Sequence, residues 1–414
     1  MRLIKLELKR VLKTRMTILL LAAALVLSLL MAYIPITFSY VNYWDDNGNQ
    51  VRLLGMDAIA YYKTAQAGTA GVVTPQKVRQ AVERYQDCLA KYGAESTYDL
   101  PKDVYSRELL PDAPLRHGIR EALADPISGL GPSITELVPE RIDEYYSACQ
   151  LRLSSLMHLE DAGHPAAQKK AEELYSRVET PFQFYPGYST DAMDYQLLLS
   201  YLVVLLCAVI AAPIFTSDYQ TRADDILRCT KHGRLRLAAA KISSALLICG
   251  AAFLICAAAY LLVSNSLFGW ECTKSSMQML YSITSLPNLN IGGLQLACAG
   301  GYLLSLLATA SFTLFLSSKI RNVVTTLSAA LVSCILPFIV VIAVPAEIGK
   351  WIYTLFPASG VALQASFLYA FSDFVFWNIG NTAIWTPYVM VIACCVDIPL
   401  FLGLAVRSYC THKV

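Results

Sequence analysis

Long runs without a charged residue alternate with short, strongly charged stretches along this chain. The uncharged runs cover Met16–Asn42, Tyr195–Ser217, Ile242–Trp270, Ser275–Ser318, Asn322–Ala346 and Thr382–Val406, the last interrupted only by Asp397. A helix needs about 20 mostly apolar residues to cross a bilayer. The pattern therefore predicts an all-α polytopic membrane protein with six spans, at 16–42, 195–217, 242–264, 290–317, 322–346 and 382–407.

The first fifteen residues, MRLIKLELKRVLKTR, have an amphipathic pattern. One helical face gathers Leu3, Ile4, Leu8, Val11 and Leu12, and another gathers Lys5, Lys9 and Lys13. Residues 1–15 are thus expected to form an interfacial helix whose basic side faces anionic lipid. The alternative is the basic start of a signal peptide, but no convincing small-residue cleavage site follows and further spans come later.

Residues 43–194, between the first two spans, are expected to form one large, mostly helical domain. Thr74-Pro75 opens a helix that runs to Tyr92 and stops at Gly93. Ser133 and Glu136 have capping-box spacing. Further helices are expected over 140–161 and 166–178, and the aromatic tail 181–189 is expected to rest on the membrane surface.

The stretch 347–381 is apolar and aromatic, but Pro357 and Gly360 interrupt it. Such a segment is too broken to cross and too apolar to leave the membrane, which predicts a re-entrant or interfacial pair of helices. A seventh and an eighth span are the alternative. That arrangement would need a hairpin turn with no basic residue on the inner side.

The distribution of Lys and Arg in short loops predicts the orientation. Basic residues gather before span 1, between spans 2 and 3, after span 4 and in the tail, at Arg2, Lys5, Lys9, Arg10, Lys13, Arg15, Arg222, Arg228, Lys231, Arg234, Arg236, Lys241, Lys319, Arg321, Arg407 and Lys413. The loops 271–289 and 347–381 carry one lysine each. The positive-inside rule then places both termini in the cytoplasm and the domain 43–194 on the other side of the membrane.

Composition and motifs argue against several function classes. Hydrophobic residues make up 56% and charged residues 15% of the chain, whereas soluble domains have about 25% charged residues. The net charge of +2 argues against nucleic acid as a partner. No G-x-x-x-x-G-K-[ST], H-E-x-x-H or G-x-S-x-G motif occurs, so we expect neither catalysis nor a cofactor or metal on this chain. Cys88 and Cys149 could pair if their domain is extracellular, which the sequence leaves open.

Asp397 is the one ionisable residue deep inside a predicted span. It precedes Arg407 by ten residues, which puts it about 15 Å into the bilayer. Intramembrane carboxylates are costly and often functional. The alternative is a structural carboxyl group that faces the bundle beside Pro399 and caps freed backbone groups.

The stretch Phe215–Ile242, FTSDYQTRADDILRCTKHGRLRLAAAKI, is the most charged one between two spans. It resembles the "F-x-x-E-Y … G-T … I-L … T-x-x-G-R … K" segment of the membrane subunits of type-2 ABC exporters. The basic helix before span 1 and the broken segment before span 6 extend that resemblance. Asp218 stands where the family has Glu, and Arg222-Ala223 replaces its Gly-Thr pair.

The resemblance implies a permease subunit that forms a translocation path and is driven by a separate ATPase, which binds ATP and Mg²⁺. Residues 218–241 would be the coupling segment that docks on this ATPase, through Asp218, Tyr219, Arg222, Asp225, Ile226, Leu227, Arg228 and Arg234. A second copy of this permease or a related one, and membrane lipid, would be its other partners. The alternative is a mechanical, sensory or immunity subunit that moves its ectodomain without carrying a substrate. A polytopic membrane enzyme lacks a catalytic constellation.

Overall fold

A computed structural model describes residues 2–44, 49–101, 103–228 and 233–411. Its described part contains six helices long and apolar enough to cross a membrane. They are α2 (Arg15–Phe38), α9 with α10 (Asp191–Ala211 and Pro213–Thr221), α12 (Leu235–Phe268), α14 (Ile291–Lys319), α15 (Val323–Ala343) and α18 (Thr386–Thr411). The chain is therefore a mostly helical protein that fits a multi-pass membrane protein.

The helices differ from the predicted spans mainly at their ends. The helix of the second span begins at Asp191, before the predicted start at Tyr195, and it is divided at Ala212, because Pro213 opens the next helix. Helix α12 begins at Leu235, seven residues before the predicted span at Ile242. The predicted sixth span begins with a strand, and its helix starts only at Thr386.

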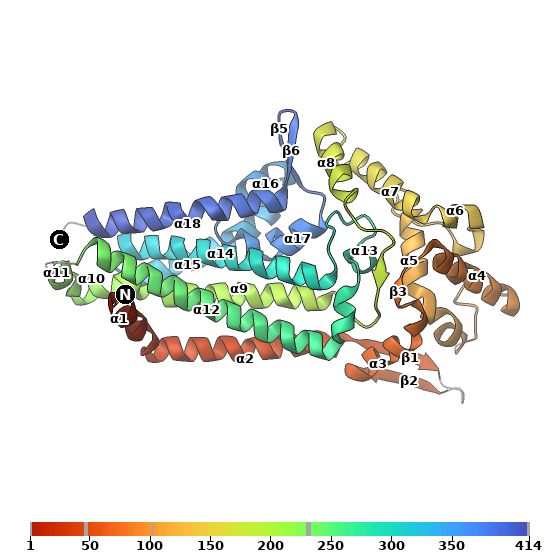
Figure 1. Cartoon of the computed structure of the whole chain (residues 1–414), viewed down its shortest axis with the longest axis horizontal. Helices are drawn as coiled ribbons and strands as arrows, with labels where there is room; N and C mark the ends of the chain where they lie inside the picture. The colour runs from red at the N-terminus through yellow and green to blue at the C-terminus, as the bar shows by residue number, and fades with distance from the viewer. Residues whose placement is uncertain (1, 45–48, 102, 229–232, 412–414) are drawn as a thin grey trace.

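The six helices lie side by side, and both ends of the chain lie at one end of the bundle (Figure 1). Helix α14 contacts α9, α12, α15 and α18. It is mostly buried, whereas α2, α15 and α18 leave most of their apolar side chains at least partly exposed. The amino-terminal helix α1 (Arg2–Leu12) packs on α12, and Ser244 Oγ donates a 3.3 Å hydrogen bond to Ile4 O.

The segment 347–381 contains no helix long enough to cross a membrane within its described residues. It has α16 (Ala346–Tyr353), two short 3-10 turns (Ser359–Val361 and Leu363–Ala365), α17 (Phe367–Ser372) and the hairpin β5 (Phe376–Ile379) with β6 (Thr382–Trp385). The ring of Phe367 packs against Gly301 of α14 and against Gly360. A Cβ atom at either glycine would come within 2.7 Å of that ring. These contacts favour the predicted broken segment over two further spans.

The domain between the first two long helices lies at the opposite end of the bundle from the termini (Figure 1). Its helices are α3 (Met56–Ala65), α4 (Pro75–Tyr92), α5 (Ala113–Ala122), α6 (Pro139–Asp143), α7 (Tyr145–Glu160) and α8 (Pro165–Tyr175). Two antiparallel strand pairs, which the sequence did not suggest, accompany them. One is the hairpin of β1 (Tyr40–Trp44) with β2 (Gln50–Leu54), and the other joins the distant strands β3 (Gly71–Val72) and β4 (Gln183–Phe184). Shorter turns are η1 (Ala67–Thr69), η2 (Tyr105–Leu109), η3 (Leu110–Asp112) and η4 (Ile134–Glu136).

Of the helix signals predicted in this domain, the one at 74–93 is confirmed, whereas the capping box at Ser133 and the single helix over 140–161 are not. Helix α4 has its predicted ends: Thr74 Oγ1 accepts from Lys77 N at 3.2 Å, and Gly93 takes a left-handed conformation. The predicted Ser133–Glu136 capping box is wrong. Only a three-residue 3-10 turn forms there, and Ser133 Oγ contacts Thr135 Oγ1 instead. The helix predicted over 140–161 is divided at Glu144.

The core of this domain includes residues from distant parts of the chain. Ile283 and Leu286 precede α14, and Phe376 and Trp385 precede α18, yet all four are buried with the helices α4, α5, α7 and α8. The short elements η5 (Trp270–Lys274) and α13 (Met277–Leu280) lie in the first of these two loops. The structural domain thus extends beyond residues 43–194.

Cys88 and Cys149 are both free thiols. Cys149 lies in the main core of the domain, while Cys88 lies in a separate small cluster with Leu100, Val104 and Leu109. The disulfide that the sequence left open is therefore not formed.

Candidate coupling site at the end of the bundle

The charged segment between α9 and α12 forms a short helical projection beside both chain termini (Figure 1). Helix α10 ends at Thr221, Arg222 turns the chain, and α11 (Ala223–Arg228) follows. Arg222 has φ 54°, a left-handed conformation that glycine adopts most easily. The turn at this position therefore carries a side chain in a conformation that favours glycine.

Asp218 is the centre of the site. Its side chain is 6% exposed and binds Lys241 Nζ, whose side chain is fully buried. Lys241 Nζ also donates to Ile214 O at 3.0 Å and lies 5.7 Å from the ring centre of Phe215. Arg10, which is 41% exposed, donates to the other carboxylate oxygen at 3.1 Å. One carboxylate thus joins α1, α10 and α12.

Further hydrogen bonds tie α10 to the end of α14. Tyr219 Oη donates to Ser318 O at 2.9 Å. Ser317 Oγ accepts from Phe215 N at 3.0 Å and donates to Ala212 O at 2.7 Å. These contacts satisfy backbone groups at the break between α9 and α10, so they fix the direction in which the projection leaves the bundle.

Tyr409 connects the same site to α18. Its ring lies 5.1 Å from that of Phe215, centre to centre, and its hydroxyl donates to Gly233 O at 3.4 Å. The side chains of Phe215 and Tyr409 are almost completely buried. The projection is therefore held by α1, α12, α14 and α18.

The residues of the coupling segment named from the sequence divide into two groups. Asp218 and Tyr219 point inward and position the segment. Arg222, Ile226 and Arg234 are exposed, Ile226 by 74%, and Leu227 is half-buried. Asp225 and Arg228 belong to α11, but their side chains lie outside the described residues. The outer group combines charged groups with an exposed branched apolar side chain.

Arg10 and Lys241 are essential to this arrangement, but neither was among the predicted site residues. A signal was present for Lys241. Asp218 directly follows one uncharged run and Lys241 directly precedes the next, so opposite charges stand at the same depth on consecutive antiparallel helices. Arg10 gave no such signal, because it lies 208 residues from Asp218 in the chain.

Asp397 is not part of this site. It lies in α18, half-buried, and its Oδ2 atom is buried without a hydrogen-bond partner among the described residues. The backbone-capping role considered for it from the sequence is thus not seen.

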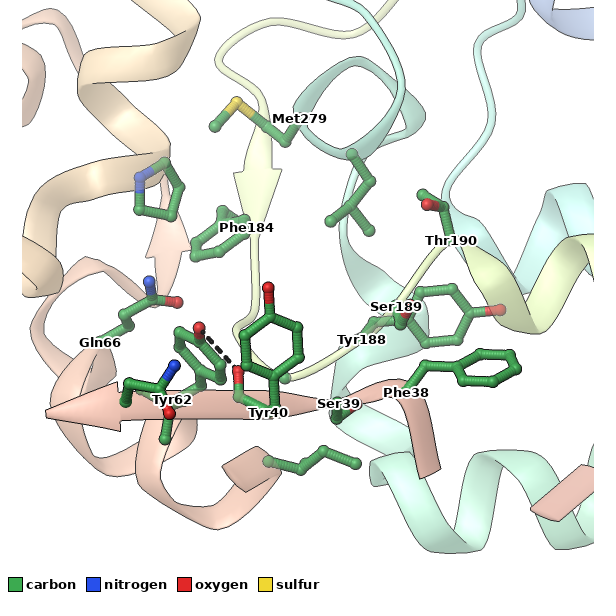
Figure 2. A pocket seen from close by; sticks show the side chains of 16 residues that line it. Phe38, Ser39, Tyr40, Tyr62, Gln66, Phe184, Tyr188, Ser189, Thr190 and Met279 are labelled. Carbon is green, nitrogen blue, oxygen red and sulfur yellow. Dashed lines mark hydrogen bonds between the residues drawn. The ribbon is translucent and has the colours of Figure 1, made fainter. Parts of the chain in front are cut away.

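A cavity of about 730 Å³ lies at the other end of the bundle, beside the domain between α2 and α9. Figure 2 shows Tyr40, Tyr62, Gln66 and Phe184 around it, with Tyr188 and Ser189 on the side of the bundle. Its lining contains no acidic or basic residue. Gln66 is 6% exposed, and its amide donates to Leu110 O at 3.3 Å. Both the domain between α2 and α9 and the bundle contribute walls to this cavity.

Buried amides join three helices near this cavity. Gln295 of α14 exchanges two hydrogen bonds of 2.9 Å with Asn265 of α12 and donates to Tyr188 Oη at 3.0 Å. Gln196 of α9 donates to Gln295 O at 2.9 Å.

No protein-family model and no curated protein matches this chain. Among the residues that the structure describes, no group of three His, Cys, Asp or Glu side chains is arranged to hold a metal ion.

Proposed function

We propose that this chain is the permease subunit of an ABC exporter and that a separate ATPase docks on the 218–241 segment. The supporting observation is the three-helix anchor: Asp218 on α10 binds Lys241 of α12 and Arg10 of α1. A solvated loop without a partner has no need of a buried ion pair at its base. A segment that transmits force does need one, because a loose base would absorb the motion.

The proposal gives each group of residues a role. Arg222, Ile226, Leu227 and Arg234, with Asp225 and Arg228 of the same helix, form the surface that contacts the ATPase. Asp218 and Tyr219 hold that surface in place. Closure of two ATPase subunits around ATP and Mg²⁺ would press on α11, and the anchor would pass the movement to α12, α14 and α18. Charge-assisted hydrogen bonds suit this task because they are strong and directional.

The proposed function also implies where the chain lies and how it assembles. The chain would lie in a bacterial plasma membrane with both termini in the cytoplasm, since Lys and Arg gather at that end of the bundle. It would work as a dimer with a second copy or a related permease. The domain between α2 and α9 would then be extracytoplasmic.

The test first asks whether a gene beside this one encodes an ABC ATPase, and then combines that ATPase with the full chain in lipid nanodiscs. We expect the ATPase to bind and its hydrolysis rate to rise, and we expect Arg234→Glu to abolish both. Arg321→Glu, another exposed basic residue outside the segment, is the matched control. Equal binding and equal stimulation by wild type and Arg234→Glu would contradict the docking site. Absence of an ATPase gene and of ATP-dependent activity would contradict the proposed function itself.

One observation favours a mechanical subunit as the second candidate. The loop before α14 is bonded into the ectodomain: Tyr175 Oη donates to Ile283 O at 2.7 Å, and Glu121 accepts from Ser282 Oγ at 2.5 Å and from Ile283 N at 3.3 Å. Motion of α14 would therefore reach the ectodomain directly. ATP-dependent movement of a candidate substrate in vesicles supports transport, whereas an ATP-dependent change in ectodomain distances without flux supports the mechanical alternative.

A further inference from the structure

Helices α1, α2 and α12 enclose an apolar groove of about 540 Å³. Its lining has helical spacing on all three: Leu8 and Leu12 on α1; Ile18, Leu21, Ala22 and Leu25 on α2; Leu247, Ile248, Ala251, Ala252, Ile255 and Cys256 on α12. Several of these side chains remain strongly exposed, including Ile18 at 53% and Ile255 at 59%. A whole face of each helix is thus turned toward a space that the described chain does not fill.

The charges at the mouth of the groove have one sign. Lys9 directly follows the lining residue Leu8, which puts it about 100° around α1, on its flank. Lys13 follows Leu12, the last residue of α1, and lies in the turn that leads to α2. Arg15 stands at the elbow where α2 begins. All three are exposed. The one acidic residue of α1, Glu7, is engaged with Arg10 at 2.9 Å, so it does not oppose this basic rim.

We propose that this groove holds an acyl chain of an anionic phospholipid, whose phosphate lies against Lys9, Lys13 and Arg15. An acyl chain matches a lining without polar side chains, and it gains dispersion contacts with the side chains of the three helices. The basic rim selects the headgroup, because basic residues beside a membrane attract anionic lipid.

The site has a structural consequence for the amino-terminal helix. Leu8 and Leu12 face the groove while Arg10 reaches Asp218 on another side of the same helix. The lipid fills the space under α1 and so holds it in the position from which Arg10 contacts the projection. This binding site does not depend on whether an ATPase docks there.

The test measures lipid retained by the full-length protein in native mass spectrometry. Samples come from nanodiscs with equal amounts of phosphatidylglycerol and phosphatidylcholine. We expect wild type to retain phosphatidylglycerol in preference. Ala251→Trp, which fills the groove, abolishes this retention, and Val332→Trp, on the exposed face of α15, leaves it unchanged. Each basic residue beside an anionic lipid strengthens binding about fivefold. Lys9→Glu with Lys13→Glu therefore weakens retention by at least about 25-fold, and Arg321→Glu does not.

Three results would overturn the proposal. Unchanged retention in Ala251→Trp would show that the lipid sits elsewhere. Equal retention of the two phospholipids by wild type would show that the basic residues do not bind the headgroup. Equal losses in the groove variants and in their controls would indicate nonspecific binding to the bundle.

Discussion

Lys241, at the start of a long apolar helix, points its ammonium group back at Asp218, the residue that ends the preceding apolar run. Both side chains are buried, and the lysine also binds the carbonyl of Ile214. The pair closes the base of the projection that carries the candidate coupling surface. Its energetics lead to the first prediction.

Removal of either partner should destabilise the protein strongly. Asp218→Leu leaves the buried ammonium group of Lys241 without a counter-ion, at a cost of about 3–5 kcal/mol. Lys241→Met leaves the Asp218 carboxylate with only the partly exposed Arg10 as a cationic partner, so its cost should be smaller. The double variant should be more stable than either single one, because no unpaired buried charge remains. Thermal unfolding of the three variants in detergent checks this order. A double variant less stable than both single variants would contradict the buried ion pair.

Arg222→Gly should stabilise the turn after α10. A side chain in the left-handed region costs about 1–2 kcal/mol, and glycine loses part of that gain to its greater freedom in the unfolded chain. We expect a net gain of about 0.5–1 kcal/mol in the free energy of unfolding. Arg222→Ala removes the charge and keeps the conformation, so it should give no gain. A gain of the same size in both variants would attribute the effect to charge.

Under the proposed function, Ile226→Asp should break ATPase binding and leave the fold intact. Exposed substitutions usually change stability by less than about 0.5 kcal/mol, whereas a central apolar contact of an interface contributes about 2 kcal/mol or more. The dissociation constant for the ATPase should therefore rise at least about tenfold. Ile127→Asp, in the ectodomain and 83% exposed, is the matched control. Equal affinities for both variants would place the docking surface away from α11.

The sequence predicted what depends on neighbouring residues. Charge-free runs are local, so six long helices were found, and Thr74, Pro75 and Gly93 gave the ends of α4 correctly. Contacts between residues far apart in the chain were not predicted, because no local pattern marks them. The carboxylate of Asp218 had been expected to face a partner, but Arg10 and Lys241 turn it inward. The spacing of Ser133 and Glu136 was a valid local signal, yet no helix follows long enough to be capped.

The predicted bounds of the domain, 43–194, missed part of its core for a related reason. Phe376 and Trp385 lie far along the chain and looked like membrane aromatics, but the β5–β6 hairpin carries them into the ectodomain core. Aromatic composition alone does not distinguish a residue buried in lipid from one buried in protein.

The thiols of the ectodomain should resist alkylation until the protein unfolds. Burial disfavours the thiolate and raises the pKa of Cys149 to about 12, and burial also raises the pKa of Cys88. At pH 8, on the order of one Cys149 in ten thousand is then a thiolate. Iodoacetamide followed by peptide mass spectrometry should modify both cysteines only in denaturant. A peptide pair that stays linked without reductant would contradict the free thiols.

Asp397 offers a way to separate structural from functional residues in a span. Its Oδ2 atom is buried without a hydrogen-bond partner in the described part of the chain, and such a group costs about 1–3 kcal/mol. Asp397→Leu should therefore leave the protein as stable or more stable by thermal unfolding. A costly carboxyl group in a membrane is usually there for activity, so ATP-dependent transport or ATPase stimulation should fall in Asp397→Leu and in Asp397→Asn. Lower stability of the leucine variant would mean that the carboxyl group has a structural partner. Full activity in both variants would show that Asp397 has no role in the mechanism.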